Sequence, residues 1–97
     1  MFDLKFNKLF LKKAKKLTQK DKKLDEKLDS TLDLMSATPF DLSLKTHKVN
    51  SKKFGERYSS RLTGDLRIIW DFDKSTQMLK IIMIQDIGGH SGNKGVY

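Results

Sequence analysis

The second half of this chain carries five side chains that are suited to chemistry on a phosphate. They are, in chain order, His47, Arg57, Arg61, Arg67 and His90. Histidine has an ordinary pKa of about 6.5, so an imidazole can take up or release a proton near neutral pH. Guanidinium groups bind phosphate oxygens and stabilise the charge that grows on them during cleavage. The set therefore favours acid–base cleavage of a phosphodiester.

RNA is the substrate that such a set can cleave without a cofactor. RNA supplies its own nucleophile, the 2′-hydroxyl, so a base, an acid and positive charge are sufficient. The chain has no cysteine, which excludes disulfides, thiolate zinc sites and cysteine nucleophiles. The histidines and aspartates have no recognisable metal-ligand spacing, and no phosphate-binding loop or nucleotide motif is present. We expect neither a metal nor a cofactor.

The charge of the chain favours a polyanionic partner. Twenty Lys and Arg residues against 12 Asp and Glu residues leave a net charge of +8. Long-range attraction of this kind makes nucleic acid the leading partner, although an acidic protein or an anionic membrane would be attracted too. Seven lysines lie between positions 12 and 23. They form either a nucleic-acid-binding stripe or the solvated face of an amphipathic helix.

Length and composition predict one domain over residues 1–97. A chain of 97 residues has about one hydrophobic core to offer, and 37% hydrophobic against 33% charged residues is typical of a charged globular protein. No apolar run approaches the roughly 20 residues of a membrane-spanning helix, and charges interrupt the first residues before a signal peptide could form. We therefore expect a cytoplasmic protein with no membrane partner.

The first half of the chain predicts a short strand followed by a helical hairpin. Residues 2–6 alternate apolar and polar, the period of a half-buried strand. Residues 7–17 place Phe10, Ala14 and Leu17 on one helical face among lysines. Thr18, followed by Asp21, offers a cap and an acidic first turn for a second helix, whose apolar stripe begins at Leu24. That helix is expected to end at residues 37–39, because the residue before Pro39 is pushed out of helical geometry. The two helices are expected to pack side by side.

The second half predicts three strands, over residues 56–62, 66–72 and 79–87, with Gly88-Gly89 ending the last. The order is then β-α-α-β-β-β. This is an α+β domain, a small and mainly antiparallel four-stranded sheet with the helical hairpin packed on one face. Short turns make the last three strands antiparallel, and the first strand, which returns through the helices, is expected to pair parallel.

Alternation along the strand 66–72 assigns its two faces. Leu66, Ile68, Trp70 and Phe72 share the apolar face, so Arg67 points to the open face. There it would meet a phosphate or form an ion pair with Asp65 or Asp71. Trp70 is expected in the core, whereas Tyr58 and Tyr97 could stack on bases.

Each histidine lies beside a feature that could expose it. His90 follows a Gly-Gly pair directly after the last strand, and His47 lies in a basic loop between Lys45 and Lys48. Taken singly, each histidine is more often an ordinary surface or core residue than a catalyst. The pair, surrounded by basic side chains, is what favours catalysis.

Three segments resemble the RelE/ParE superfamily of bacterial type II toxins, and the YafQ-like mRNA interferase branch above all. They read LKTHKV, GERYSSRLTGDLRIIWDFD and LKIIMIQDIGGH, with a terminal VY. The resemblance extends over the whole chain and is most specific in the last fifty residues. It implies a small sheet with a helical hairpin, ribosome-dependent endoribonuclease activity on mRNA without a cofactor, and a cognate antitoxin that neutralises the toxin.

The resemblance also implies roles for individual residues. His90 in DIGGH and His47 in KTH resemble catalytic histidines, and Asp65 and Arg67 resemble the acidic residue and the arginine of the R-I-I-type strand. The remaining basic and aromatic candidates for binding phosphate or RNA are Arg57, Arg61, Lys45, Lys48 and Tyr97.

Three positions depart from the YafQ-like pattern. Arg61 stands where that branch has a further histidine, Asp86 stands where it can carry an arginine, and SGNKG lengthens the spacing between His90 and Tyr97 from four residues to seven. Two alternatives follow. One is a ParE-like toxin that acts on DNA gyrase without nuclease activity, and the other is a degenerate homologue that binds only its antitoxin or RNA.

Overall fold

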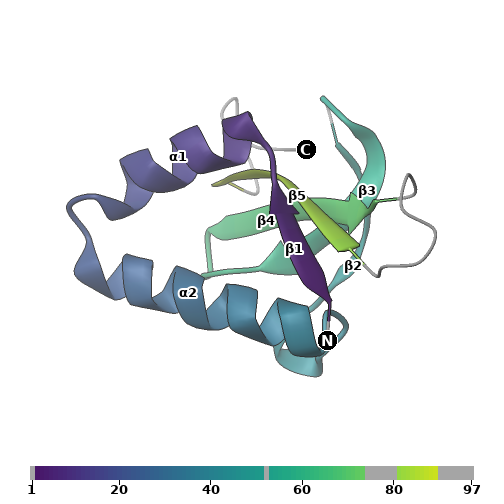
Figure 1. The fold of residues 1–97 in the computed structure, drawn as a ribbon, viewed down its shortest axis with the longest axis horizontal. Coiled ribbons are helices and arrows are strands. Elements are labelled where there is room, and N and C mark those ends of the chain that lie inside the picture. Colours follow the sequence, from purple (N-terminus) through teal and green to yellow (C-terminus); the bar gives the residue numbers. More distant parts are fainter. Residues whose placement is uncertain (1, 52, 74–80, 90–97) are drawn as a thin grey trace.

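The computed structural model describes residues 2–51, 53–73 and 81–89. The elements run in the order β1 (Asp3–Phe6), α1 (Lys8–Thr18), α2 (Lys22–Ala37), the 3₁₀ turn η1 (Leu42–Leu44), β2 (His47–Ser51), β3 (Gly55–Arg61), β4 (Leu66–Phe72) and β5 (Ile81–Gly89). Figure 1 shows both helices on the same side of the sheet. The α+β class and the helical hairpin are confirmed.

Both helices begin at side chains that suit an N-cap, but the predicted cap of the second helix was wrong. Thr18 is the last residue of α1, where its hydroxyl donates to the Ala14 carbonyl, and Asp21, predicted in the first turn, is the N-cap of α2. The Asn7 side chain accepts a hydrogen bond from the Phe10 amide at 2.9 Å, and Asp21 accepts one from the Leu24 amide at 3.0 Å. Each cap satisfies a backbone donor that has no partner within its own helix. The second helix ends at Ala37, two residues before Pro39, as the sequence predicts.

The sheet has the strand order β1-β5-β4-β3-β2. The first strand pairs parallel with β5, with Phe6 opposite Ile84, which confirms the expected crossover pairing. The other neighbours are antiparallel. The structure adds β2, a strand that the sequence prediction had placed in a loop; its backbone pairs with β3 over five positions, from His47 opposite Ser59 to Ser51 opposite Gly55.

The end of β5 also differs from the prediction. Gly88 and Gly89 do not stop the strand, because they pair with Arg67 and Leu66 of β4. Glycine has no side chain to disfavour pairing with an adjacent strand, so a partner strand can hold it in extended conformation.

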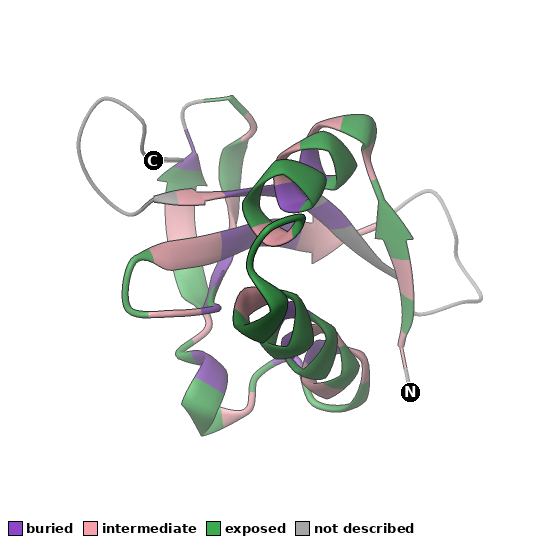
Figure 2. Ribbon diagram, turned by 90° about the vertical axis from the view of Figure 1, so that its left-hand side faces the viewer, coloured by how far each residue is buried: buried purple, intermediate pink, exposed green. Residues whose placement is uncertain are grey.

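The hydrophobic core lies between the two helices and the face of the sheet that they cover (Figure 2). The helices contribute Phe10, Ala14, Leu28 and Met35, and the strands contribute Ile68, Trp70, Ile84 and Ile87. Leu44 of η1 and Leu62, which follows β3, complete the cluster. Leu66 and Phe72 pack against this cluster, so the predicted apolar face of β4 is confirmed. Among the described residues, no helix is long and apolar enough to span a membrane.

A row of hydrogen bonds joins the core to the start of β2. The Trp70 indole N–H donates to Ser60 Oγ at 2.7 Å, and Ser60 Oγ lies 2.7 Å from Thr46 Oγ1. Thr46 donates in turn to the carbonyl oxygen of Pro39 at 2.7 Å. Trp70 is therefore a core residue with its polar atom satisfied, which is how a buried tryptophan is normally accommodated.

The face of the sheet opposite the helices is called the far face below. Alternation places Arg67 and Ile69 of β4 there, because Ile68 and Trp70 belong to the core cluster. Cross-strand partners share a face, so His47, Ser59, Ile69 and Asp86 form one row across four strands. The sequence predicted that this face is open to solvent. Its centre is not, because Ser59, Ile69 and Asp86 are buried.

Candidate functional site

Two arginines lie directly opposite each other on the far face. Arg61 of β3 pairs with Arg67 of β4, and Gly88 of β5 is the next partner across the sheet. Like charges placed opposite each other on neighbouring strands destabilise a sheet unless an anion or a carboxylate balances them. Gly88 adds no side chain to this row. The row has the charge to attract an anionic group.

The guanidinium of Arg67 is only partly satisfied by the described chain. Its Nη1 donates to the carbonyl oxygen of Thr63 at 3.1 Å, while the buried Nε has no hydrogen-bond partner among the described residues. Within that part of the chain Arg67 is in none of the ion pairs, which join Lys5 to Asp73, Lys13 to Asp86 and Arg57 to Asp71. A buried donor without a partner is costly, so this atom is suited to an acceptor from a ligand.

One ring nitrogen of His47 is held by a backbone carbonyl. His47 is exposed at the first position of β2, and its Nδ1 lies 2.8 Å from the carbonyl oxygen of Lys45. A carbonyl can only accept, so this hydrogen bond requires the proton on Nδ1 and leaves the lone pair of the neutral ring on Nε2. Lys45 itself has a left-handed backbone, φ 48°, which is sparsely populated for residues with a side chain.

His47 and the two arginines are near neighbours on the sheet. His47 pairs with Ser59, two positions before Arg61 on the same face of β3. Such diagonal positions are about 7 to 8 Å apart, within reach of long side chains. The structure therefore brings His47, Arg61 and Arg67 to one end of the far face.

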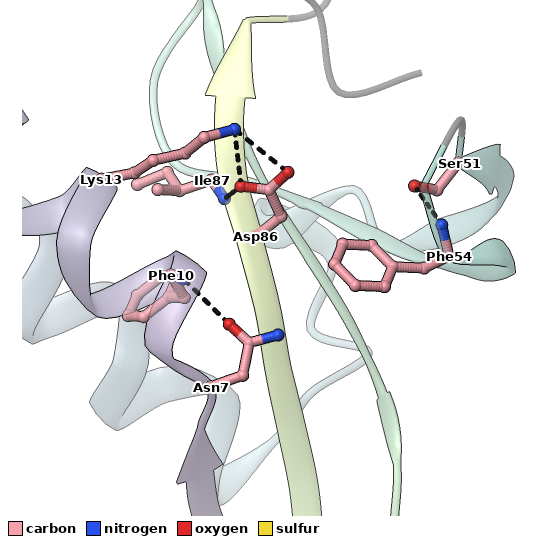
Figure 3. Close-up of polar contacts among 7 residues, drawn as sticks. All are labelled: Asn7, Phe10, Lys13, Ser51, Phe54, Asp86 and Ile87. Carbon is pink, nitrogen blue, oxygen red and sulfur yellow. Dashed lines mark hydrogen bonds and ion pairs between the residues drawn. The ribbon is translucent and has the colours of Figure 1, made fainter.

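The neighbouring row, which begins at His47, ends in a carboxylate that an ion pair holds in place. Asp86 of β5 receives Lys13 of α1 at 2.9 Å and 3.2 Å on its two oxygens, and also accepts from the Ile87 amide at 2.8 Å. Figure 3 shows the Lys13 side chain extending from α1 to this carboxylate. The Asp86 side chain is 5% exposed. A buried carboxylate with a cation and an amide donor is satisfied, so Asp86 does not neutralise Arg67.

A bulge in the pairing of β4 with β5 makes this arrangement possible. Ile69 lies opposite Asp86, whereas the next residue, Trp70, lies opposite Ile84. The extra residue in β5 lets Ile84 and Ile87 both join the core while Asp86 takes the far face. Neither the bulge nor the Lys13–Asp86 contact was predicted from the sequence. The only available signal was an acidic residue inside an otherwise apolar strand.

The other predicted binding residues lie away from this cluster. Arg57 is on the far face, where it meets Asp71 at 3.7 Å. Lys48 lies on the opposite face of β2 from His47, with its ammonium 5.9 Å from the centre of the Tyr58 ring. Tyr58 in turn stacks on Trp70 at 4.8 Å. Lys48 and Tyr58 thus flank the core side of the sheet.

Of the remaining predicted site residues, only Asp65 belongs to the described part of the chain. Asp65 is exposed in the turn between β3 and β4, and its amide donates to Thr63 Oγ1 at 3.2 Å. His90 and Tyr97 lie outside the described residues. Gly89, which precedes His90 in the sequence, pairs with Leu66, the first residue of β4, beside the arginine row.

The described residues form no cluster that could hold a metal ion, and one of their carboxyl groups has a lowered pKa. No group of three or more histidine, cysteine, aspartate or glutamate side chains gathers in a way that could hold a metal ion within residues 2–51, 53–73 and 81–89. The Ser43 hydroxyl, followed by the Ser43 amide, donates to Asp41 and lowers the pKa of that carboxyl. Asp41 therefore stays ionised at neutral pH, outside the arginine row.

No protein-family model and no curated protein sequence matches this chain. Several solved structures are similar to it. The YoeB/ParE toxin from Agrobacterium tumefaciens aligns with a TM-score of 0.73 at 14% identity, and the alignment covers 93% of this chain and 100% of the toxin chain. The archaeal RelE–RelB complex from Pyrococcus horikoshii gives 0.69 at 19%, covering 93% and 96%.

A complex of YafQ with DinJ from E. coli gives a TM-score of 0.66 at 23% identity, covering 93% of this chain and 94% of that one. At these identities the likeness concerns the backbone arrangement. This chain therefore has the fold of the YoeB, RelE and YafQ toxins.

Proposed function

We propose that this protein is the toxin of a bacterial type II toxin–antitoxin system and that it cleaves mRNA on the ribosome. The observation that carries the proposal is the Arg61–Arg67 pair with its unsatisfied guanidinium, next to the exposed His47. The shared fold with YoeB, RelE and YafQ toxins supports the toxin role. The expected site of action is the cytoplasm, where ribosomes and mRNA occur.

In the proposed reaction the 2′-hydroxyl of the RNA loses its proton to a base and attacks the adjacent phosphorus. The bond to the 5′-oxygen of the next nucleotide breaks, and an acid protonates that oxygen. The products are a 2′,3′-cyclic phosphate and a 5′-hydroxyl, so atoms and protons balance without a metal. His47 Nε2 has the lone pair that a base requires, and His90 is its proposed counterpart.

The arginines stabilise the negative charge that develops on the phosphate. Held on neighbouring strands, their guanidiniums need little reorganisation when the charge appears, which is the condition for effective electrostatic catalysis. Asp65, which is exposed in the turn that precedes Arg67, is a further member of the proposed site. Arg57, Lys45, Lys48 and Tyr97 are proposed to bind the RNA outside the reacting phosphate.

A cognate antitoxin is the second proposed partner. The net charge of +8 favours an acidic segment laid over the basic surface. The structures of similar fold include complexes of RelE with RelB and of YafQ with DinJ. We expect the antitoxin to suppress growth inhibition when it is expressed together with this protein.

The decisive experiment is to induce the protein alone in translating cells and to map the ends of their mRNA. New ends within translated regions support the proposal. Intact mRNA together with DNA damage would instead indicate a gyrase-directed toxin, and normal growth would indicate a degenerate homologue.

The His90→Ala variant tests the proton-transfer role in the same cells. We expect loss of mRNA cleavage and growth inhibition with unchanged thermal stability and antitoxin binding. Full toxicity of this variant would contradict the assignment of His90.

A further inference from the structure

A second candidate site lies beside the arginine row. A pocket of about 530 Å³ opens between α2, η1 and the end of β3, and Arg61 contributes to its wall. This volume lies within the range of small-ligand sites, roughly 300 to 1,000 Å³. Three leucines form its apolar lining, and the polar lining comes from Lys27, Ser30, Thr31, Ser43, Arg61 and Thr63.

The Thr31 hydroxyl lacks a partner in the wall of this pocket. The Thr31 residue is 5% exposed. None of the hydrogen bonds among the described residues involves its hydroxyl, and its oxygen is not among their fully buried side-chain atoms that lack a partner, so the hydroxyl is open to the pocket. A threonine within a helix usually donates to the backbone carbonyl one turn earlier or faces solvent. A hydroxyl that makes no such bond and lines a pocket can bond to a polar group that enters it.

Two neighbouring hydroxyls have defined donor and acceptor roles. Thr63 Oγ1 already accepts from the amides of Asp65 and Leu66 at 3.2 Å and 3.0 Å, so its own proton remains to be donated. The Ser43 hydroxyl donates to Asp41 at 2.7 Å, which leaves its oxygen as an acceptor. The pocket thus offers both donors and acceptors, as a sugar hydroxyl requires.

The charged residues of the wall are both cations. Lys27 comes from α2 and Arg61 from β3, and the lining, which belongs to the described part of the chain, includes no carboxylate. An anionic group is therefore favoured over a cationic one. The same lining residues include no aromatic ring. Base stacking, the usual means of holding a single-stranded base, has no platform here.

We propose that this pocket binds the ribose phosphate of a nucleotide that flanks the phosphate held by Arg61 and Arg67. This assignment rests on the proposed function, because it takes the RNA to be the substrate. The cations hold the phosphate, and the hydroxyl set reads the 2′-hydroxyl, the group that distinguishes RNA from DNA. Contact with the sugar and phosphate makes recognition at this position independent of base identity.

The test is an amide NMR titration of the purified chain with a short single-stranded RNA, with DNA of the same sequence and with adenosine 5′-monophosphate. The expected result is a shift of the Thr31, Ser43 and Thr63 amides by RNA and a weaker shift by DNA. In the Thr31→Val variant, RNA binding should weaken about threefold to tenfold, and the preference for RNA over DNA should fall.

A second variant tests the pocket without changing a buried residue. Lys27 is exposed, so Lys27→Ala should fold normally and should weaken RNA and DNA binding alike. Lys53→Ala, which removes the same charge from the exposed turn between β2 and β3, is the matched control and should leave the pocket shifts unchanged.

The outcomes separate the pocket from the proposed function. RNA that leaves the three amides unshifted, or that binds wild type and Thr31→Val equally, overturns the pocket even if mRNA is cleaved in cells. Pocket shifts with intact mRNA in induced cells overturn the nuclease and leave the pocket. Saturation by adenosine 5′-monophosphate without any response to RNA assigns the pocket to a free nucleotide and overturns the flanking position.

Discussion

At the scale of single residues, Arg67 is the most constrained group of the candidate site. Its Nε is buried and has no partner among the described residues, and Arg61 lies directly opposite. An arginine that served only to hold the sheet together would be expected to meet a carboxylate. Two carboxylates of the far face are committed elsewhere, since Asp71 pairs with Arg57 and Asp86 with Lys13.

We predict that Arg67→Ala lowers mRNA cleavage about 10²- to 10³-fold, the usual effect of removing one donor to a developing negative charge. Arg67→Lys should retain intermediate activity, because it keeps the charge and loses the planar fork. Cleavage by purified protein on programmed ribosomes measures both variants. Wild-type rates for Arg67→Ala, with normal folding verified by circular dichroism, would remove Arg67 from the site.

At the scale of elements, the Lys13–Asp86 ion pair ties α1 to β5 next to the arginine row. The contact joins residues 73 positions apart in the sequence, and it stabilises the strand that precedes His90. The bulge beside it lets one strand supply both core side chains and a carboxylate on the far face. The ion pair therefore helps to fix the position of the end of β5 relative to α1.

We predict that Lys13→Met destabilises the protein by about 2 kcal/mol, because it leaves Asp86 without its cation. The effect should be smaller than the roughly 3 to 5 kcal/mol typical of a fully buried pair, since the Lys13 side chain is 37% exposed. Denaturant unfolding measures this difference in the free energy of unfolding.

Lys12→Met is the matched control for that prediction. Lys12 is its exposed neighbour on the same helix, so the substitution should change stability by less than about 0.5 kcal/mol. Replacing both partners, as Lys13→Met with Asp86→Leu, should recover part of the loss. Equal stability of the two single lysine variants would show that the ion pair contributes nothing.

At the scale of the whole molecule, the positive charge of the helices is concentrated on α1, which has five lysines and no acidic residue, whereas α2 has three lysines and four acidic residues. The lysines of α1 include exposed positions Lys8, Lys12 and Lys16, away from the arginine row. Charges of this kind attract a polyanion at long range and bind its phosphates without reading sequence.

Replacing Lys8, Lys12 and Lys16 together by alanine should weaken binding to single-stranded RNA. Each phosphate that a lysine neutralises contributes about 0.7 to the slope of log K against log salt, so the slope should become shallower by up to about 2. Fluorescence anisotropy at several salt concentrations measures the slope. The matched triple replacement by arginine should preserve it, and an unchanged slope in the alanine variant would show that α1 is a solvated face only.

Local patterns in the sequence were sufficient to predict the helical hairpin, the end of its second helix and the apolar face of β4, but not the residue that caps α2. Hydrophobic period and the proline after α2 act over a few neighbouring residues, so they can be read without knowing the rest of the fold. The predicted placement of Arg67 opposite the core face followed from the same alternation. The roles of His90, His47, Arg61 and the other predicted site residues stay predictions.

The tertiary structure decided what depends on distant pairing. It formed β2, which has a weak pattern of its own and is held by β3, and it thereby moved His47 from a loop into the sheet and separated it from Lys48. It also placed Arg61 opposite Arg67, joined Lys13 to Asp86, and assembled the pocket around Thr31 from three elements. Register and burial arise from contacts between segments far apart in the chain, and such contacts leave little trace in local sequence.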